Sequence, residues 1–237
     1  MLLNKKQNNK KYHGRNFLEK GFTLIELMIV IGIFSILTSV IVFNYAKFNS
    51  DILLTNMAYE VALDIREAQV FSLGVRSANT GSADDFNTRY GVYFDKAEGG
   101  NEKKFVFFAD RDSSGNCDDG SGSGSSCSIE ACTAGGGNEC ESISTLTRDS
   151  IFEEICVSDD GTTPMNFDTG VCTGTGVSKD TISITFARPN PDTLVSDGTN
   201  EYNTAAILMR SNQEDFKKAV HILSNGQISI KTVLINP

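Results

Sequence analysis

Histidine and basic residues are scarce in this chain of 237 residues, and each shortage excludes a class of protein. The two histidines leave little material for histidine-based catalysis or for a zinc site. Only 21 lysines and arginines oppose 30 aspartates and glutamates, which argues against a general polyanion binder, because lysine and arginine make the phosphate contacts. A single long apolar run argues against a multi-span membrane protein, and 40% hydrophobic residues argues against disorder.

The N-terminal segment combines a basic stretch with that apolar run. Six basic residues and one acidic residue occupy positions 1–21, and residues 22–43 follow without Lys, Arg or Pro. As a helix, the run would be about 33 Å long, which is enough to cross a bilayer. The basic flank predicts that the N-terminus is cytoplasmic and that the rest of the chain is extracytoplasmic. No small-residue cleavage site follows the run, so an ordinary secretory signal peptide is not expected.

An acidic residue, Glu26, interrupts the apolar run near its start. A carboxylate in lipid costs about 2.5–3.5 kcal/mol, which indicates that this one has a partner. The surrounding motif resembles the class III leader and N-terminal helix of type IV prepilins and pseudopilins: Gly21-Phe22-Thr23-Leu24-Ile25-Glu26-Leu27. The resemblance implies that a membrane peptidase cuts between Gly21 and Phe22 and methylates the new N-terminus. It also implies that Glu26 pairs with the α-ammonium group of a neighbouring subunit during assembly.

The helix is predicted to continue beyond the membrane, because no proline occurs before Pro164. Apolar residues at steps of three and four form one stripe: Leu54, Met57, Val61, Ile65 and Ala68. Gly74 is the expected end of the helix. We therefore predict an α+β fold with a leader peptide (1–21), a long helix (22–74) with a transmembrane half (22–43), and a β-rich extracytoplasmic head (75–237). Position 43 is Phe where major pilins often have a kinking proline, so the resemblance to major subunits is weaker.

From residue 89 onward the apolar period is two, which indicates strands. The expected strands are residues 90–94, 105–108, 181–186, 205–209, 220–223 and 228–235. Asn225-Gly226 predicts a two-residue hairpin, because both positions tolerate positive φ. We expect one antiparallel sheet that covers the exposed half of the helix. Residues 89–118 and 181–230 resemble minor subunits of the GspH/FimT type.

Residues 113–142 form an insertion that is half Gly or Ser and is expected to be loose unless it is tied down. An even number of cysteines in an exported domain predicts up to three disulfides, with fifteen possible pairings. The cysteines are Cys117, Cys127, Cys132, Cys140, Cys156 and Cys172. Their spacing contains no C-x-x-C and no neighbouring histidine, so zinc is not expected.

An acidic segment before the insertion matches the opening of a calcium loop. Its candidate ligands are Asp110, Asp112, Ser114 and Asp118. The twelfth position of the loop is Ser121 rather than a bidentate glutamate, so we favour an acidic turn without metal. No cofactor is expected.

No catalytic constellation is apparent, and His221 within a predicted strand is expected to be structural or solvent-facing. The chain is therefore predicted to be a non-enzymatic minor pilin or pseudopilin of a type IV pilus or a type II secretion pseudopilus. Its expected partners are other pilin or pseudopilin subunits, the prepilin peptidase and the inner membrane, before it enters the filament. The sequence does not distinguish pilus, secretion and competence machines, because these machines share the N-terminal motif.

Two alternatives remain open. One is a DNA-binding minor pilin for natural transformation, with a basic patch from Arg210, Lys217, Lys218 and Lys231. Gln227-Ile228-Ser229 stands where those members carry arginines, and loss of the leader leaves 15 basic and 29 acidic residues, a formal charge of −14. The other is an exported enzyme or binding protein that uses the same anchor.

Overall fold

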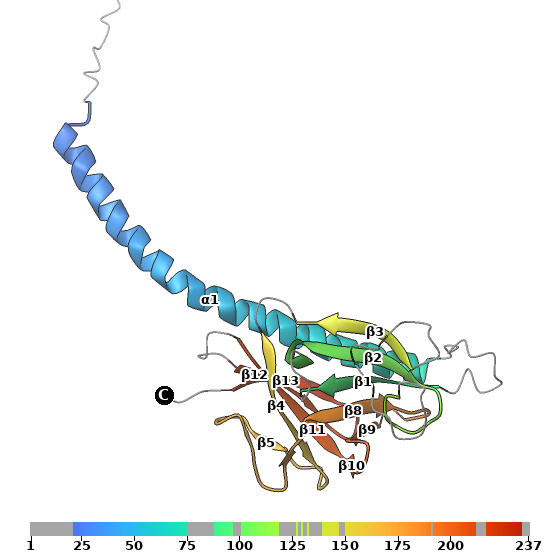
Figure 1. Cartoon of the computed structure of the whole chain (residues 1–237). Coiled ribbons are helices and arrows are strands. Elements are labelled where there is room, and N and C mark those ends of the chain that lie inside the picture. The colour runs from blue at the N-terminus through green and yellow to red at the C-terminus, as the bar shows by residue number, and fades with distance from the viewer. Residues whose placement is uncertain are drawn as a thin grey trace, which may run out of the picture. The chain divides into compact units, whose positions relative to one another are not determined.

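The computed structural model describes residues 21–74, 88–96, 101–118, 127, 129, 132, 139–146, 150–190, 192–211 and 217–233. The chain divides into two compact units at Tyr45/Ala46, which we describe separately. One helix, α1 (Leu24–Leu73), runs through both units (Figure 1). It ends where expected, and the Gly74 N–H donates to the Val70 carbonyl at 2.9 Å. The predicted helix of about 50 residues is confirmed, and the predicted leader lies almost wholly outside the described residues.

In the first unit, the apolar side chains of α1 are exposed. The one hydroxyl that is half-buried, Thr38 Oγ1, donates to the Phe34 carbonyl at 2.9 Å and so is satisfied within the helix. This part of α1 is long and apolar enough to cross a membrane, by length and composition. Its apolar surface finds no cover within the described part of the chain, which is consistent with a single-pass membrane anchor.

In the second unit, α1 buries one stripe against the β-strands. The fully buried side chains of this stripe are Leu54, Ala58, Val61, Ile65 and Ala68. Met57, which the sequence predicted in the stripe, lies partly buried at its edge, and Ala58 takes its place. The reason is that steps of four, three, four and three keep side chains on one face, whereas Met57 is rotated by about 100° from Ala58.

Two antiparallel sheets form the head, rather than the single sheet expected. The first has the order β10-β9-β8-β1-β2-β3 and the second β13-β12-β11-β4-β7. The strands of the first sheet are β1 (Arg89–Asp95), β2 (Lys104–Asp110), β3 (Cys140–Thr145), β8 (Thr181–Phe186), β9 (Thr193–Ser196) and β10 (Glu201–Tyr202). Those of the second are β4 (Ile151–Ser158), β7 (Val177–Ser178), β11 (Thr204–Arg210), β12 (Lys217–Ile222) and β13 (Ile228–Val233). A short 3₁₀ helix η2 (Asn101–Lys103) precedes β2, and β5 (Met165–Asn166) pairs with β6 (Val171–Cys172).

All six predicted strands are present, and the α+β fold class is confirmed. The terminal hairpin differs in its turn. The Gly226 N–H donates to the Leu223 carbonyl at 2.9 Å, so Ser224 and Asn225 are the central residues of the turn. Among the residues of this turn, only Gly226 has a positive φ, at 77°. The connection is therefore a turn followed by a left-handed glycine, a longer hairpin loop than the two-residue one expected.

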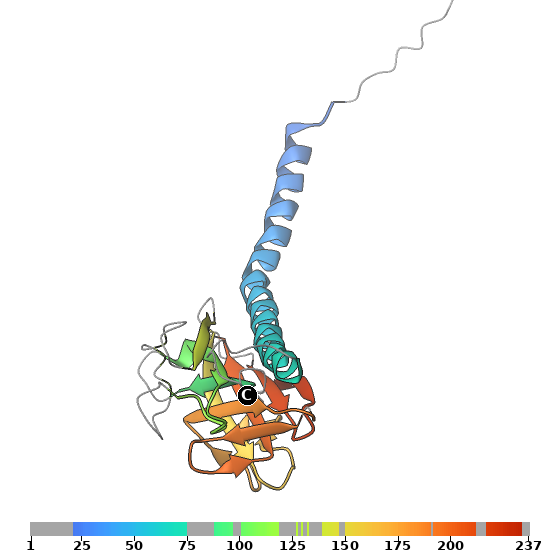
Figure 2. The same cartoon turned by 90° about the vertical axis from the view of Figure 1, so that its right-hand side faces the viewer.

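The main core lies between α1 and the inner faces of both sheets. Alternate side chains of the central strands point into it, such as Val92 and Phe94 on β1 and Ile184 on β8. The second sheet contributes Ile155 and Ile207 to the same core. The half of α1 beyond Tyr45 thus packs on both sheets, where it is seen beside the strands in Figure 2.

Each sheet also buries apolar side chains on its outer face. In the first sheet, Tyr93, Val106 and Phe108 pack against cysteines of the insertion. In the second sheet, Leu208 and Ala206 pack with Cys156 under the segment that holds β5 and β6. Because both faces of each sheet are covered, the sequences of these strands are almost continuously apolar, as in residues 105–109.

Candidate functional site

The predicted processing and assembly residues lie at the first turn of α1. Thr23 caps this helix: its Oγ1 accepts the Glu26 N–H at 3.3 Å, and its carbonyl accepts the Leu27 N–H at 3.2 Å. Glu26 is therefore the third helical residue, the position that a glutamate takes in a capping box. Its carboxylate lies at the partially positive end of the helix, which favours a negative charge.

Beyond this cap, the first turn contacts little. The Phe22 side chain is 82% exposed, and Glu26 is exposed as well. Glu26 forms no ion pair within the described residues. The geometry thus presents an apolar helix end with one carboxylate that is available to a cation from outside the chain.

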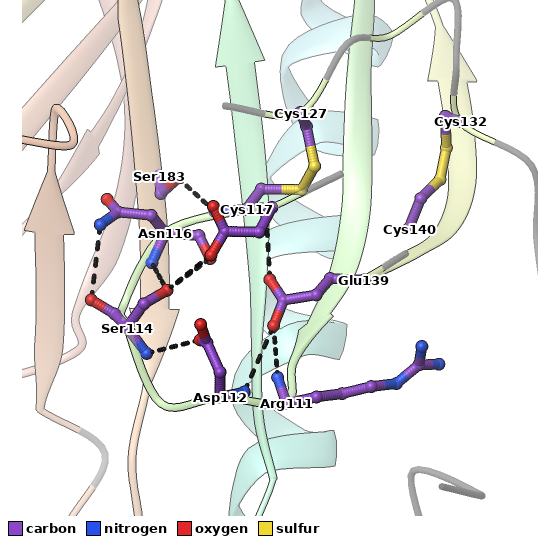
Figure 3. Close-up of a disulfide and its surroundings, with 11 residues drawn as sticks. Arg111, Asp112, Ser114, Asn116, Cys117, Cys127, Cys132, Glu139, Cys140 and Ser183 are labelled. Carbon is purple, nitrogen blue, oxygen red and sulfur yellow. Dashed lines mark hydrogen bonds between the residues drawn. A yellow bond between two sulfur atoms is a disulfide. The ribbon is translucent and has the colours of Figure 1, made fainter. Parts of the chain in front are cut away.

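The cysteines form three disulfides in which each cysteine is joined to the next one along the chain. The pairs are Cys117–Cys127, Cys132–Cys140 and Cys156–Cys172. The first two lie side by side where the insertion leaves β2 and enters β3 (Figure 3). The third joins β4 to β6 and so holds the outer cover of the second sheet. Spacing alone left fifteen pairings open, because it does not show which segments the strands bring together.

The acidic segment after β2 folds as a compact turn around Glu139, a residue that the sequence analysis missed. Glu139 Oε1 accepts the N–H groups of Arg111 at 2.6 Å and of Asp112 at 3.4 Å, while its Oε2 accepts the Asp118 N–H at 3.0 Å (Figure 3). The structure brings carboxylate oxygens of Asp110, Asp112 and Glu139 within 4.8 Å of one another. Glu139 is next to Cys140, and only the pairing of β2 with β3 brings it to Asp110.

The other two predicted ligands are placed differently. Ser114 Oγ lies 3.2 Å from Asp118 Oδ2, to which it donates, and the Ser114 N–H donates to Asp112 Oδ1 at 2.9 Å. These bonds hold the turn together. Asp118 is not among the three clustered carboxylates.

Burial dominates the electrostatics of this cluster. The Asp110 side chain is fully buried, and burial raises its pKa to about 6; Asp112 adds to the rise, while the Gly115 N–H and Arg89 oppose it. Burial also raises the pKa of Glu139 to about 7, against the backbone N–H groups that it accepts, and the charges of Asp110 and Asp112 raise it further. Asp110 Oδ2 accepts the Gly115 N–H at 3.0 Å, but Asp110 Oδ1 is buried without a hydrogen-bond partner.

Two lysines of the predicted basic patch are paired with carboxylates. Lys217 Nζ lies 2.7 Å from Glu153 Oε1, and Lys218 Nζ lies 3.3 Å from Asp51 Oδ1. Such pairing lowers the positive charge that the patch offers to phosphate groups. DNA binding stays a prediction without a structural observation that favours it.

His221 faces the outer side of the second sheet, where it is buried and its ring lies 5.6 Å from that of Phe167. Burial lowers the pKa of His221, and the charge of Lys231 lowers it further. This environment is that of a structural histidine.

Comparison with known families gives one match. Residues 17–42 match the family described as the prokaryotic N-terminal methylation motif. The match includes Gly21, Phe22 and Glu26 and extends over most of the exposed apolar part of α1. None of the curated proteins and none of the solved structures compared shows significant similarity to the chain. This match likens the N-terminus of the chain to that of type IV pilin-like proteins and does not extend to the head.

Proposed function

We propose that this chain is a minor pilin or pseudopilin of the GspH/FimT type, cleaved after Gly21, N-methylated at Phe22 and assembled into a filament. The filament is a type IV pilus or a type II secretion pseudopilus. The observation that carries the proposal is the methylation motif over residues 17–42, with Glu26 on an apolar helix that the rest of the described chain leaves uncovered. A helix followed by antiparallel strands and a terminal hairpin supports the subtype.

The assembly mechanism follows from the chemistry of the first turn. Cleavage gives Phe22 an α-ammonium group, and Glu26 lies four residues further on, about 6 Å along a helix axis. A neighbour displaced by about one helical turn therefore places its ammonium beside this carboxylate. In lipid, an unpaired carboxylate costs about 2.5–3.5 kcal/mol, so the pair is favoured at the matching register. The apolar helix surfaces pack around it.

The capping role of Glu26 must be separated from its role as a charge. Glu26→Gln keeps a residue that suits the capping box but removes the charge. Thr23→Ala removes the cap, which costs about 1 kcal/mol, and leaves the charge in place. These two variants form a matched pair at the same helix end.

The experiment expresses both variants at native level and measures membrane insertion, leader cleavage and recovery in the sheared or cross-linked filament fraction. Glu26→Gln should insert and be cleaved normally, yet its recovery in filaments should fall about tenfold or more, because register pairing is lost. Thr23→Ala should enter filaments at close to the wild-type level. Normal incorporation of Glu26→Gln contradicts the proposal, and so does the reverse pattern, in which only Thr23→Ala fails.

A further inference from the structure

A buried carboxylate oxygen without a partner lies at the base of the disulfide-bonded insertion. Asp110 is 0% exposed at the end of β2, and its Oδ1 accepts no hydrogen bond. One carboxylate oxygen of Asp112 and one of Glu139 lie within 4.8 Å of a carboxylate oxygen of Asp110. Glu139 is itself only 5% exposed. Burying an unpaired charge is costly, so this arrangement calls for a counter-charge.

Within the described residues, side chains supply that counter-charge only in part: the charge of Arg89 lowers the pKa of Asp110 but does not outweigh its burial. None of the ion pairs there involves Asp110, Asp112 or Glu139. The nearest guanidinium in sequence, that of Arg111, is directed to Glu141, with 3.1 Å between Nη2 and Oε1. Oε1 of Glu139 accepts two backbone N–H groups, but Oε2 accepts only that of Asp118 within the described residues and so keeps a lone pair available.

The chemistry of the donors selects the kind of ion. All three groups offer carboxylate oxygen, and the nearby cysteines are in disulfides and offer no thiolate. Oxygen donors suit Ca²⁺ or Mg²⁺ rather than Zn²⁺. Ca²⁺ binds oxygens at about 2.3–2.6 Å in flexible geometry, so two ligands on opposite sides lie up to about 5.2 Å apart, whereas Mg²⁺ at about 2.1 Å requires a tighter, near-octahedral group.

We propose that Asp110, Asp112 and Glu139 bind a Ca²⁺ ion at the base of the β2–β3 hairpin, with Asp110 Oδ1 as a buried ligand. The remaining coordination positions are open to water, because Asp112 is exposed to solvent. The ion would join the end of β2, the acidic turn and the residue before β3 in one linkage.

This site would act together with the neighbouring disulfide. The Glu139 N–H donates to the Asp118 carbonyl at 3.2 Å, and the Cys127 N–H donates to the Cys117 carbonyl at 2.9 Å. The Cys117 N–H in turn donates to Ser183 Oγ on β8 at 3.2 Å (Figure 3). Bound Ca²⁺ would therefore fix the start of the Gly/Ser-rich insertion against the first sheet. The inference concerns the head alone and does not rest on filament assembly.

The test uses the full chain with disulfides intact, purified in detergent and stripped with EDTA, with Ca²⁺ alone as the probe. Extracellular calcium sites have dissociation constants of about 0.1–1 mM, so 10 mM CaCl₂ should raise the unfolding temperature by about 3–10 °C. Titration calorimetry on the wild type should give one site per chain. An equal concentration of MgCl₂ should give a smaller shift.

Two variants and one control locate the ion. Asp110→Asn and Glu139→Gln should each reduce the Ca²⁺ shift to about 1 °C or less, and their unfolding temperatures in EDTA show whether they fold. Glu141→Gln removes an adjacent carboxylate that is directed to Arg111 and should keep the full shift. The proposal is overturned if wild type shows neither a shift nor binding heat, if both ligand variants keep the shift, or if MgCl₂ equals CaCl₂.

Discussion

The buried carboxyl group of Asp110 makes the stability of the metal-free head depend on pH in a defined direction. Its pKa in the folded chain is about 6, against 3.8 in an unfolded chain. Between these values the folded state binds more protons than the unfolded state, so stability falls as pH rises through this window. A difference of about 2 pH units corresponds to about 3 kcal/mol, which the wild type loses in full above the folded-state pKa.

Asp110→Asn removes this penalty while keeping the size of the side chain and an oxygen that can accept the Gly115 N–H. In EDTA at pH 8, the variant should be more stable than wild type by up to about 3 kcal/mol, which is about 6–12 °C in unfolding temperature. At pH 4 the advantage should be nearly absent, because the wild-type carboxyl group is then protonated in the folded state. The gain should develop between about pH 4 and pH 6.

The assay is thermal unfolding of the full chain in detergent and EDTA at half-unit steps from pH 4 to pH 8, for wild type, Asp110→Asn and Glu141→Gln. The last variant controls for general loss of acidic charge, since Glu141 is only half-buried and directed to Arg111. A stability difference between wild type and Asp110→Asn that stays constant with pH would contradict the raised pKa of Asp110. A variant that is less stable than wild type at pH 8 would refute it too.

Two further predictions concern the scaffold. A Cβ at Gly91 would lie 2.6 Å from a backbone carbonyl oxygen of β8, the strand that pairs with β1. Gly91→Ala should therefore lower the free energy of unfolding by about 1–3 kcal/mol. An unchanged free energy of unfolding in denaturant would contradict this close approach of the two strands. Burial opposes ionisation of Asp197, but the hydrogen bond from Lys179 and two backbone N–H groups outweigh it and lower the pKa of Asp197. Asp197→Asn should therefore lose about 1–3 kcal/mol at pH 7, and the loss should shrink as pH falls below about 4; a loss independent of pH contradicts this account.

Local patterns in the sequence were sufficient for the long helix and for the six strands with clear alternation. They missed the other strands, of which β4 is the longest, and the register of β4 explains why it was missed. Leu208 pairs with Glu154 while Met209 pairs with Phe152, so Glu153 is an extra residue in the strand. This bulge sends Phe152 and Ile155 into the same core although they are three residues apart, which breaks the period of two.

The acidic cluster was only partly predictable for a different reason. Asp110 and Asp112 are close in sequence and suggested a cation loop, but Glu139 comes from the far end of a long insertion. Its position depends on the pairing of β2 with β3, which also contains an irregularity, between Phe107 and Phe108. A contact across a hairpin of this loop length has no local signature, and the same holds for the disulfide pairing.

The mature N-terminus of the chain shows whether it is processed for filament assembly. The measurement is intact mass and N-terminal sequence of the protein from its native membrane, with and without reductant. We predict a chain that starts at N-methyl-Phe22 and gains about two mass units per disulfide on reduction, about six for the three disulfides described. A chain that still starts at Met1, in cells with an active prepilin peptidase, would contradict it.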